Sequence, residues 1–98
     1  MTPDISCVIP VHNDKRRLPR AVASALGQGP AVQVVLVDDA STDGSRELAA
    51  EMARGDPRIV AFALPQNRGQ GFARNLGVAL TDALIVTFLD QDDEHAPG

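Results

Sequence analysis

The stretch VQVVLVDDAS, at residues 32–41, is the most informative part of the sequence about the fold. All of its first six residues except Gln33 are apolar, and they do not alternate with polar ones. This pattern is typical of a strand buried on both faces of a parallel sheet. The acidic pair Asp38 and Asp39 follows at once, where open parallel sheets bind their ligands. The stretch therefore predicts a buried strand that ends at a functional edge.

On both sides of this stretch, strand-like and helix-like segments alternate along the chain. Apolar runs occupy Ile5–Pro10, Arg58–Leu64 and Ala83–Leu89, and we expect each to be a strand buried on both faces. Between the runs, apolar residues recur at helical spacing: Leu18, Val22 and Leu26, then Leu48 and Met52, then Phe72, Leu76 and Leu80.

Such an alternation predicts an α/β fold, a three-layer, Rossmann-like parallel sheet with helices on its faces. The expected strand order is 3-2-1-4, in a single domain covering residues 1–98. Local signals agree with these boundaries. Gly27 and Gly55 are placed to end the first and second helices, and Thr42 and Asp43 offer side chains to cap the start of the second.

Composition excludes several classes of protein. The 98 residues carry 9 basic and 13 acidic side chains, a net charge of −4, which argues against a nucleic-acid binder. Cys7 is the only cysteine, so an internal disulfide and a cysteine-rich zinc site are excluded, and we interpret Cys7 as a small buried apolar residue. The first four residues lack the basic start of a signal peptide, so we expect none, and no apolar run is long enough to cross a membrane. We expect a cytoplasmic protein, with membrane association left open for a longer parent.

Polar residues follow three of the four predicted strands. Pro10, His12 and Asn13 come after the first, Asp38-Asp39 after the second, and Asp90-Gln91-Asp92-Asp93 after the fourth. In the order 3-2-1-4 these ends meet at one edge, where clustered carboxylates need a cation. Oxygen donors favour Mg²⁺ or Mn²⁺ over zinc. In an extended segment Asp90 and Asp92 point the same way, so both are candidate metal ligands.

Other residues near this edge allow more than one interpretation. We assign one of the pair Asp38 and Asp39 to a structural turn and the other to a ligand, where a carboxylate can accept a hydrogen bond from a nucleobase N–H. Arg74 is either a cation near a diphosphate or the partner of a nearby Asp. For His12 we favour a ligand contact over a role as a general base. The basic run at residues 15–20 is interpreted as a solvated helix end.

These residues resemble the family 2 glycosyltransferases of the GT-A fold. The matching motifs are CVIPVHN at residues 7–13, VDDASTDGS at 37–45, NRGQGFARNLG at 67–77 and FLDQDD at 88–93. Together they span almost the whole chain, in the family's order. One departure is His12, where the family usually has Tyr or Phe.

The resemblance implies a truncated GT-A fold, the N-terminal half that binds a nucleotide-diphospho-sugar donor with a divalent metal. By motif position, Pro10, His12 and Asn13 would line the nucleotide pocket, and Asp39 would meet the base. Arg74 would lie near the base or the diphosphate. Asp90 would lie near the ribose or the metal, and Asp92 would be the principal metal ligand. A UDP-sugar is the expected donor, and the hydroxyl acceptor, a saccharide, lipid or other compound, is unknown.

The family inverts the sugar's anomeric configuration, using a carboxylate base downstream of the Asp-x-Asp. No residue of this chain can be assigned that role, so we expect donor binding with weak or absent transfer. The alternatives are a non-catalytic nucleotide-binding or dimerisation module, a metal-dependent phosphoryl-transfer domain and a receiver-like domain. An uncovered edge at the fourth strand would favour a homodimer.

Overall fold

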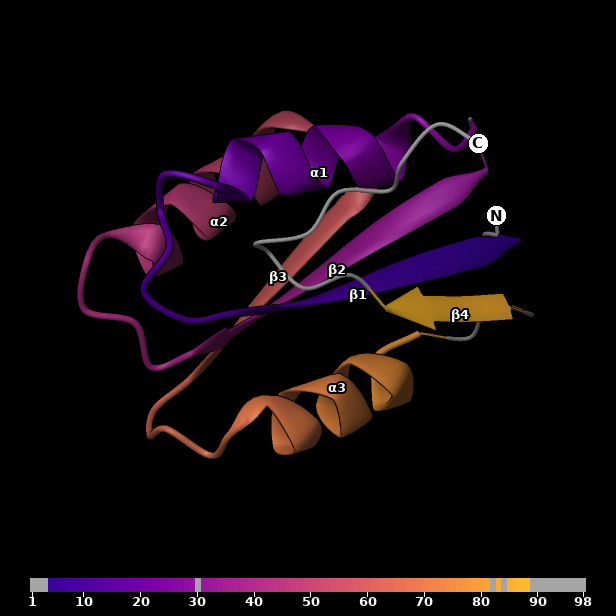
Figure 1. The fold of residues 1–98 in the computed structure, drawn as a ribbon. Coiled ribbons are helices and arrows are strands. Elements are labelled where there is room, and N and C mark those ends of the chain that lie inside the picture. The colour runs from indigo at the N-terminus through magenta and orange to yellow at the C-terminus, as the bar shows by residue number, and fades with distance from the viewer. Residues whose placement is uncertain (1–3, 30, 82, 84, 89–98) are drawn as a thin grey trace.

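The computed structural model describes residues 4–29, 31–81, 83 and 85–88. Strands and helices alternate: β1 (Ile5–Val11), α1 (Leu18–Leu26), β2 (Val32–Asp39), α2 (Ser45–Gly55), β3 (Ile59–Leu64), α3 (Gln70–Ala79) and β4 (Ile85–Phe88). All neighbouring strands are parallel, in the order β3-β2-β1-β4. The predicted alternation and strand order are confirmed (Figure 1).

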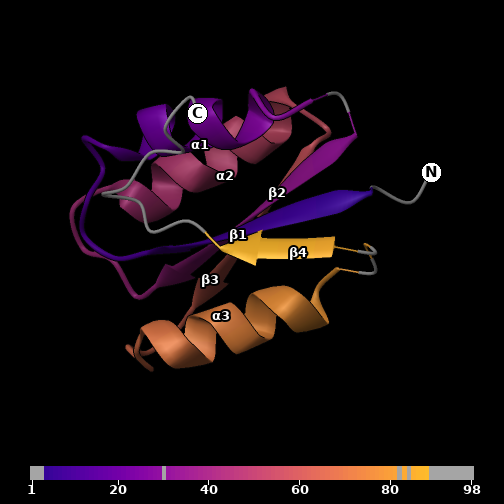
Figure 2. The same ribbon diagram turned by 45° about the vertical axis from the view of Figure 1, so that its right-hand side comes forward.

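The helices form two layers, with α1 and α2 on one face of the sheet and α3 on the other (Figures 1 and 2). Successive side chains of a strand point to opposite faces. Accordingly, Ile9 and Leu36 pack in the core beneath α1 and α2, whereas Val8 and Val37 pack in the core beneath α3. The same alternation determines whether a polar residue at the end of a strand lies on the face covered by α1 and α2 or on the face covered by α3.

The prediction that all four strands are buried on both faces is wrong for the two outer ones. β1 and β2 lie in the middle of the sheet and are almost wholly buried. β3 and β4 form its edges, so Phe62 on β3 and Ile85 and Phe88 on β4 are 43 %, 55 % and 47 % exposed. Among the described residues, β4 pairs with β1 alone.

The α3 layer depends on a glycine that lets the helix approach the sheet. Gly77 is buried, and a Cβ added to it would lie 2.3 Å from Cγ1 of Val8, which is itself fully buried. Only a residue without a side chain fits there, because the neighbouring atom belongs to a stiff β-branched side chain in a central strand.

Helix ends follow the sequence signals in part. Gly27 is the C-cap of α1, and α2 ends at Gly55, as predicted. At the start of α2, however, the N-cap is Gly44, not Thr42 or Asp43. Asp43 acts from one residue earlier, where its Oδ1 accepts the N–H of Ser45 at 2.9 Å. The expected capping by the Thr42 side chain is wrong, because its hydroxyl, like its backbone N–H, donates to Oδ1 of Asn13 in the neighbouring loop.

Cys7 is fully buried in the core beneath α1 and α2, as expected for a small apolar residue. Burial raises the pKa of its thiol. No helix in the described part of the chain has both the length and the apolar character to cross a bilayer.

Candidate functional site

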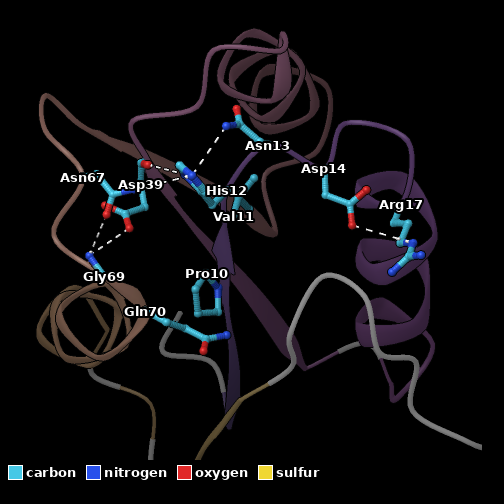
Figure 3. A pocket seen from close by; sticks show the side chains of 10 residues that line it. All are labelled: Pro10, Val11, His12, Asn13, Asp14, Arg17, Asp39, Asn67, Gly69 and Gln70. Atoms are coloured by element: carbon cyan, nitrogen blue, oxygen red, sulfur yellow. Dashed lines mark hydrogen bonds and ion pairs between the residues drawn. The ribbon is translucent and has the colours of Figure 1, made fainter.

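A pocket of about 410 Å³ opens at the carboxyl ends of β1 and β2 (Figure 3). It is bounded by the β1–α1 loop, by the last residue of β2 and by the start of α3. Its described lining residues are Pro10, Val11, His12, Asn13, Asp14, Arg17, Asp39, Asn67, Gly69 and Gln70. The strand order places it beside the junction of β1 and β4, where the chain's crossovers change direction.

The end of β1 presents His12 to the pocket in a defined tautomer. Its Nδ1 lies 2.7 Å from the backbone oxygen of Asp39. Because a carbonyl oxygen only accepts, Nδ1 carries the proton in this contact. Nε2 of the neutral ring is then an acceptor, and the amide Nδ2 atoms of Asn67 and Asn13 lie 3.4 and 3.5 Å from it. The exposed ring is thus oriented by β2 and by the loop before α3.

Asp39 fastens the start of α3 to the sheet. It is 4 % exposed, and its position two residues after Val37 turns it to the α3 face. Oδ1 accepts the N–H of Arg68 at 2.7 Å, and Oδ2 accepts that of Gly69, the N-cap of α3, at 2.9 Å. The carboxylate therefore satisfies two donors at the positive end of a helix.

Asn67 completes this turn. Its Oδ1 accepts the N–H of Gly69 at 3.1 Å, which is an Asx turn leading into the helix. Gly69 itself has φ 87°, a conformation that favours glycine. These contacts hold the backbone of the loop close to Asp39 and leave the amide of Asn67 on the pocket wall (Figure 3).

Asn13 ties the β1–α1 loop to the β2–α2 loop. Its backbone N–H donates to Oγ of Ser41 at 2.9 Å, and its Oδ1 accepts the N–H of Thr42 at 2.7 Å. Its φ of 48° is left-handed, which Asn tolerates better than most residues. The side-chain oxygen is thus used within the protein, and the Nδ2 donor is the part of the amide directed at His12.

A second set of bonds joins the same two loops. Asp43 Oδ2 accepts the N–H of Lys15 at 3.1 Å, and Oγ of Ser45 accepts that of Asp14 at 3.2 Å. Hydrogen bonds from the Ser45 hydroxyl and from the Lys15 backbone hold the pKa of Asp43 below its usual value. The Lys15 side chain lies over Gly44, where an added Cβ would come within 3.2 Å of it.

Asp38 lies on the opposite face from Asp39 and is 1 % exposed. Its Oδ2 accepts the N–H of Ser41 at 2.9 Å, which closes the turn after β2, while its Oδ1 has no hydrogen-bond partner among the described residues. The expectation that only one of the two acids is structural needs correction, because both Asp38 and Asp39 accept backbone N–H groups.

The structure brings together four of the residues predicted from the sequence. Pro10, His12, Asn13 and Asp39 all line the pocket. Arg74 is half-buried within α3 and is not among the described lining residues. Asp90, with Asp92 after it, lies outside the described residues.

Four other polar or charged side chains among the described lining residues were not predicted: Asp14, Arg17, Asn67 and Gln70. The role of Asn67 could have been predicted, because an Asn two residues before a Gly at the start of a helix is typical of an Asx turn. The other three depend on how the loops fold back over the strand ends.

The described residues alone do not form a metal site. In the described ranges, no three His, Cys, Asp or Glu side chains group closely enough to hold an ion. The carboxylate of Asp39 is already bonded to two N–H donors. The predicted metal ligands Asp90 and Asp92 lie outside the described residues.

The chain matches a known protein family and several of its members over almost all of its length. The model of the family "Glycosyl transferase family 2" matches residues 6–98. The succinoglycan biosynthesis protein ExoO of Rhizobium meliloti is 41 % identical over 96 residues, which cover 97 % of this chain and 27 % of that protein. The putative teichuronic acid biosynthesis glycosyltransferase TuaG of Bacillus subtilis is 34 % identical, over 94 % of this chain and 37 % of its own length.

Solved structures share the fold. The mannosyltransferase PcManGT of Pyrobaculum calidifontis, in complex with GDP-Man and Mn²⁺, superposes with a TM-score of 0.79 at 23 % identity and covers 94 % of this chain and 28 % of its own. Residues 1–349 of TarS from S. aureus, in complex with UDP, give 0.77 at 28 % identity, covering 96 % of this chain and 28 % of theirs. The chain thus spans roughly a third or less of the proteins it resembles.

Proposed function

The chain belongs to glycosyl transferase family 2, and from that premise we propose that it forms the donor-binding half of a glycosyltransferase that uses a nucleotide-diphospho-sugar. The observation that carries the proposal is the pocket at the ends of β1 and β2, where His12 and Asp39 line one wall. The complex of TarS with UDP supports a nucleotide ligand for a pocket on this fold.

Asp39 keeps acceptor capacity for a base. An ionised carboxylate offers about four lone-pair positions, of which Arg68 and Gly69 use two. A uracil N3–H or guanine N1–H is a donor that a remaining position can accept. Asp39 then holds the helix start and selects the base with the same group.

His12 supports the same ligand through its ring. The ring is exposed and is held at one edge by the backbone oxygen of Asp39, and we propose that it packs against a planar base. Base stacking on an aromatic ring contributes on the order of 1–3 kcal/mol. Pro10, two residues earlier and within β1, also lines the pocket and adds an apolar surface.

A divalent cation, Mn²⁺ or Mg²⁺, fits the donor chemistry that the sequence supplies near this edge. Asp92, with Asp90, would hold it through oxygen ligands, which such hard cations prefer. When bound, it would neutralise charge on the leaving nucleoside diphosphate. The residues described here would hold the base and the loops in place around it.

The transfer itself would invert the sugar in one displacement by an acceptor hydroxyl. We assign no carboxylate base for that hydroxyl among the described lining residues, and the match to this chain covers only 27 % of ExoO and 37 % of TuaG. We therefore propose donor binding for this chain, with transfer completed by sequence of the kind the longer relatives carry. A module that binds nucleotide without turnover, or one that dimerises through β4, is the alternative.

The test is calorimetric titration of the chain with UDP, GDP and dTDP, each with Mn²⁺ and with EDTA. We expect one nucleotide to bind in a metal-dependent manner and Asp92→Ala to remove the metal dependence. Glu51→Gln, which removes an exposed carboxylate from α2, is the control and should bind like the wild type. A folded chain that binds none of the three nucleotides would refute the proposal.

A further inference from the structure

Asn67 joins the start of α3 to the ring of His12 with the two ends of one amide. Its Oδ1 accepts the N–H of Gly69 at 3.1 Å, and its Nδ2 lies 3.4 Å from Nε2 of His12. The side chain is exposed on the pocket wall. Resting on the proposed function, we propose that Asn67 is a positioning residue, which sets the orientation of the His12 ring against which the base packs.

These contacts close a circuit of hydrogen bonds on the pocket wall, through His12, Asp39, Gly69 and Asn67 (Figure 3). Nδ1 of His12 donates to the backbone oxygen of Asp39 at 2.7 Å. Oδ2 of Asp39 accepts, at 2.9 Å, the same N–H of Gly69 that Asn67 receives. Because Asp39 is 4 % exposed, the circuit is anchored at a group that water scarcely reaches.

Only one arrangement of protons satisfies the whole circuit. The N–H of Gly69 can only donate, so the oxygen of the Asn67 amide faces it and the NH₂ group faces His12. The backbone oxygen of Asp39 can only accept, so Nδ1 of His12 carries the proton and Nε2 of the neutral ring accepts. A donor therefore meets an acceptor at Nε2, although the two assignments start from different residues.

A second amide reaches the same nitrogen from the β1–α1 loop. Nδ2 of Asn13 lies 3.5 Å from Nε2 of His12, and Oδ1 of Asn13 accepts the N–H of Thr42 at 2.7 Å. Neither amide can turn its oxygen toward the ring without giving up a bond to a backbone N–H. Asn67 is the nearer of the two, and it belongs to the loop that Asp39 holds, so it ties the ring to the start of α3.

Such restraints matter for an exposed ring. The terminal torsion of a His side chain is broad, and His12 is exposed, so the side chain alone does not fix the plane of the ring. Contacts at both ring nitrogens hold the ring by its edge atoms. A base that packs against a ring already held in place loses less conformational freedom on binding. Removing the contact from Asn67 should therefore weaken nucleotide binding without abolishing it.

The first experiment is a double-mutant cycle on the affinity for UDP and GDP, measured by calorimetry. Asn67→Ser keeps an oxygen that can accept the N–H of Gly69 but is too short to reach His12. We expect it to weaken binding about three- to tenfold in the wild type, and less than about twofold in the His12→Phe background, because a phenyl ring has no nitrogen to hold.

Gln66→Ser is the matched control for this cycle. Gln66 is the exposed neighbour of Asn67 and is not among the described lining residues of the pocket. The substitution should change the affinity less than about twofold in either background.

The second experiment observes the ring directly, by nitrogen NMR of His12 in the free chain at a pH where the wild-type ring is neutral. Asn67→Asp keeps an acceptor for Gly69 and adds a negative charge at the start of a helix, so we expect the fold to be kept. It places an acceptor where the NH₂ group stood. We expect a proton to appear on Nε2 in Asn67→Asp, whereas the wild type and Gln66→Ser carry it on Nδ1.

The outcomes separate this proposal from the proposed function. Equal weakening by Asn67→Ser in both backgrounds would show that Asn67 acts on the nucleotide or on the loop, and would overturn the positioning role. His12 signals that are the same in Asn67→Asp and in the wild type would overturn it as well, and this test stands even if Asn67→Ser unfolds. A folded wild type that binds no nucleotide would refute the donor site, whereas the nitrogen signals of the free chain would still decide whether Asn67 orients His12.

Discussion

Replacing Asp39 by Asn tests how the pocket is built, because the substitution keeps the size of the side chain and changes one oxygen to an NH₂ group. In the structure each carboxylate oxygen accepts a different backbone N–H, from Arg68 and from Gly69. In Asp39→Asn one of these donors faces another donor, in a position that is 4 % exposed. The charge at the start of α3 is lost as well.

The cost follows from these contacts. Losing one hydrogen bond to a charged acceptor costs about 1.5–3 kcal/mol, and removing a negative charge from a helix N-terminus costs about 0.3–1 kcal/mol more. We expect the free energy of unfolding to fall by about 3 kcal/mol. A chain of this length is stable by roughly 5–15 kcal/mol, and its melting temperature would fall by about 12–24 °C.

Urea unfolding monitored by circular dichroism measures this loss, with the slope used to check that the transition stays two-state. Glu51→Gln removes the same charge from an exposed position on α2 and should stay within about 0.5 kcal/mol of the wild type. If Asp39→Asn were as stable as that control, Asp39 would not fasten α3, and our account of the pocket wall would be wrong.

Three further predictions concern the core, the loops and the tautomer. Gly77→Ala should lower the free energy of unfolding by about 2 kcal/mol, because overpacking against Val8 costs up to about 3 kcal/mol and the higher helix propensity of Ala offsets about 1 kcal/mol of it. An unchanged urea midpoint would contradict the close packing of α3 against Val8. Folding lowers the pKa of Asp43, so this carboxylate stabilises the folded chain above its ordinary pKa of 3.8, and the stabilisation is lost as the pH falls through the pKa of the folded state. The free energy of unfolding of Asp43→Asn should therefore depend less steeply on pH in acid than that of the wild type. An equally steep dependence would argue against this role of Asp43. Nitrogen NMR of neutral His12 should show the proton on Nδ1, facing the carbonyl of Asp39, and a proton on Nε2 would refute the hydrogen bond.

The order of elements and the strand order could be predicted because they depend on features that sequence displays directly. In buried strands, apolar residues do not alternate with polar ones, and in helices apolar residues recur every three to four positions. Crossovers between parallel strands are right-handed. The exposure of β3 and β4 could not be seen in the same way. An edge strand and a central strand have similar composition, and Phe62 is apolar although it is 43 % exposed.

The candidate site was predictable only as far as its residues follow strand ends. Pro10, His12 and Asp39 do so, and they line the pocket. The use of both oxygens of Asp39 by the loop before α3 depends on the left-handed turn at Gly69, which strand and helix periodicity do not report. Asp14 and Gln70 line the pocket because the loop conformations bring them over the strand ends, and the periodicity of the sequence does not reveal these conformations either.

The most direct test of the central claim is to map nucleotide binding onto the backbone by ¹⁵N–¹H NMR of the chain with UDP or GDP and Mg²⁺. We predict that the largest shifts belong to the amides around His12, Asp39 and Gly69, which lie on the wall of the pocket. The amides of the α2 C-terminus, near Arg54, should not move. Shifts confined to another surface, or none at millimolar nucleotide, would contradict the assignment of this pocket to the donor.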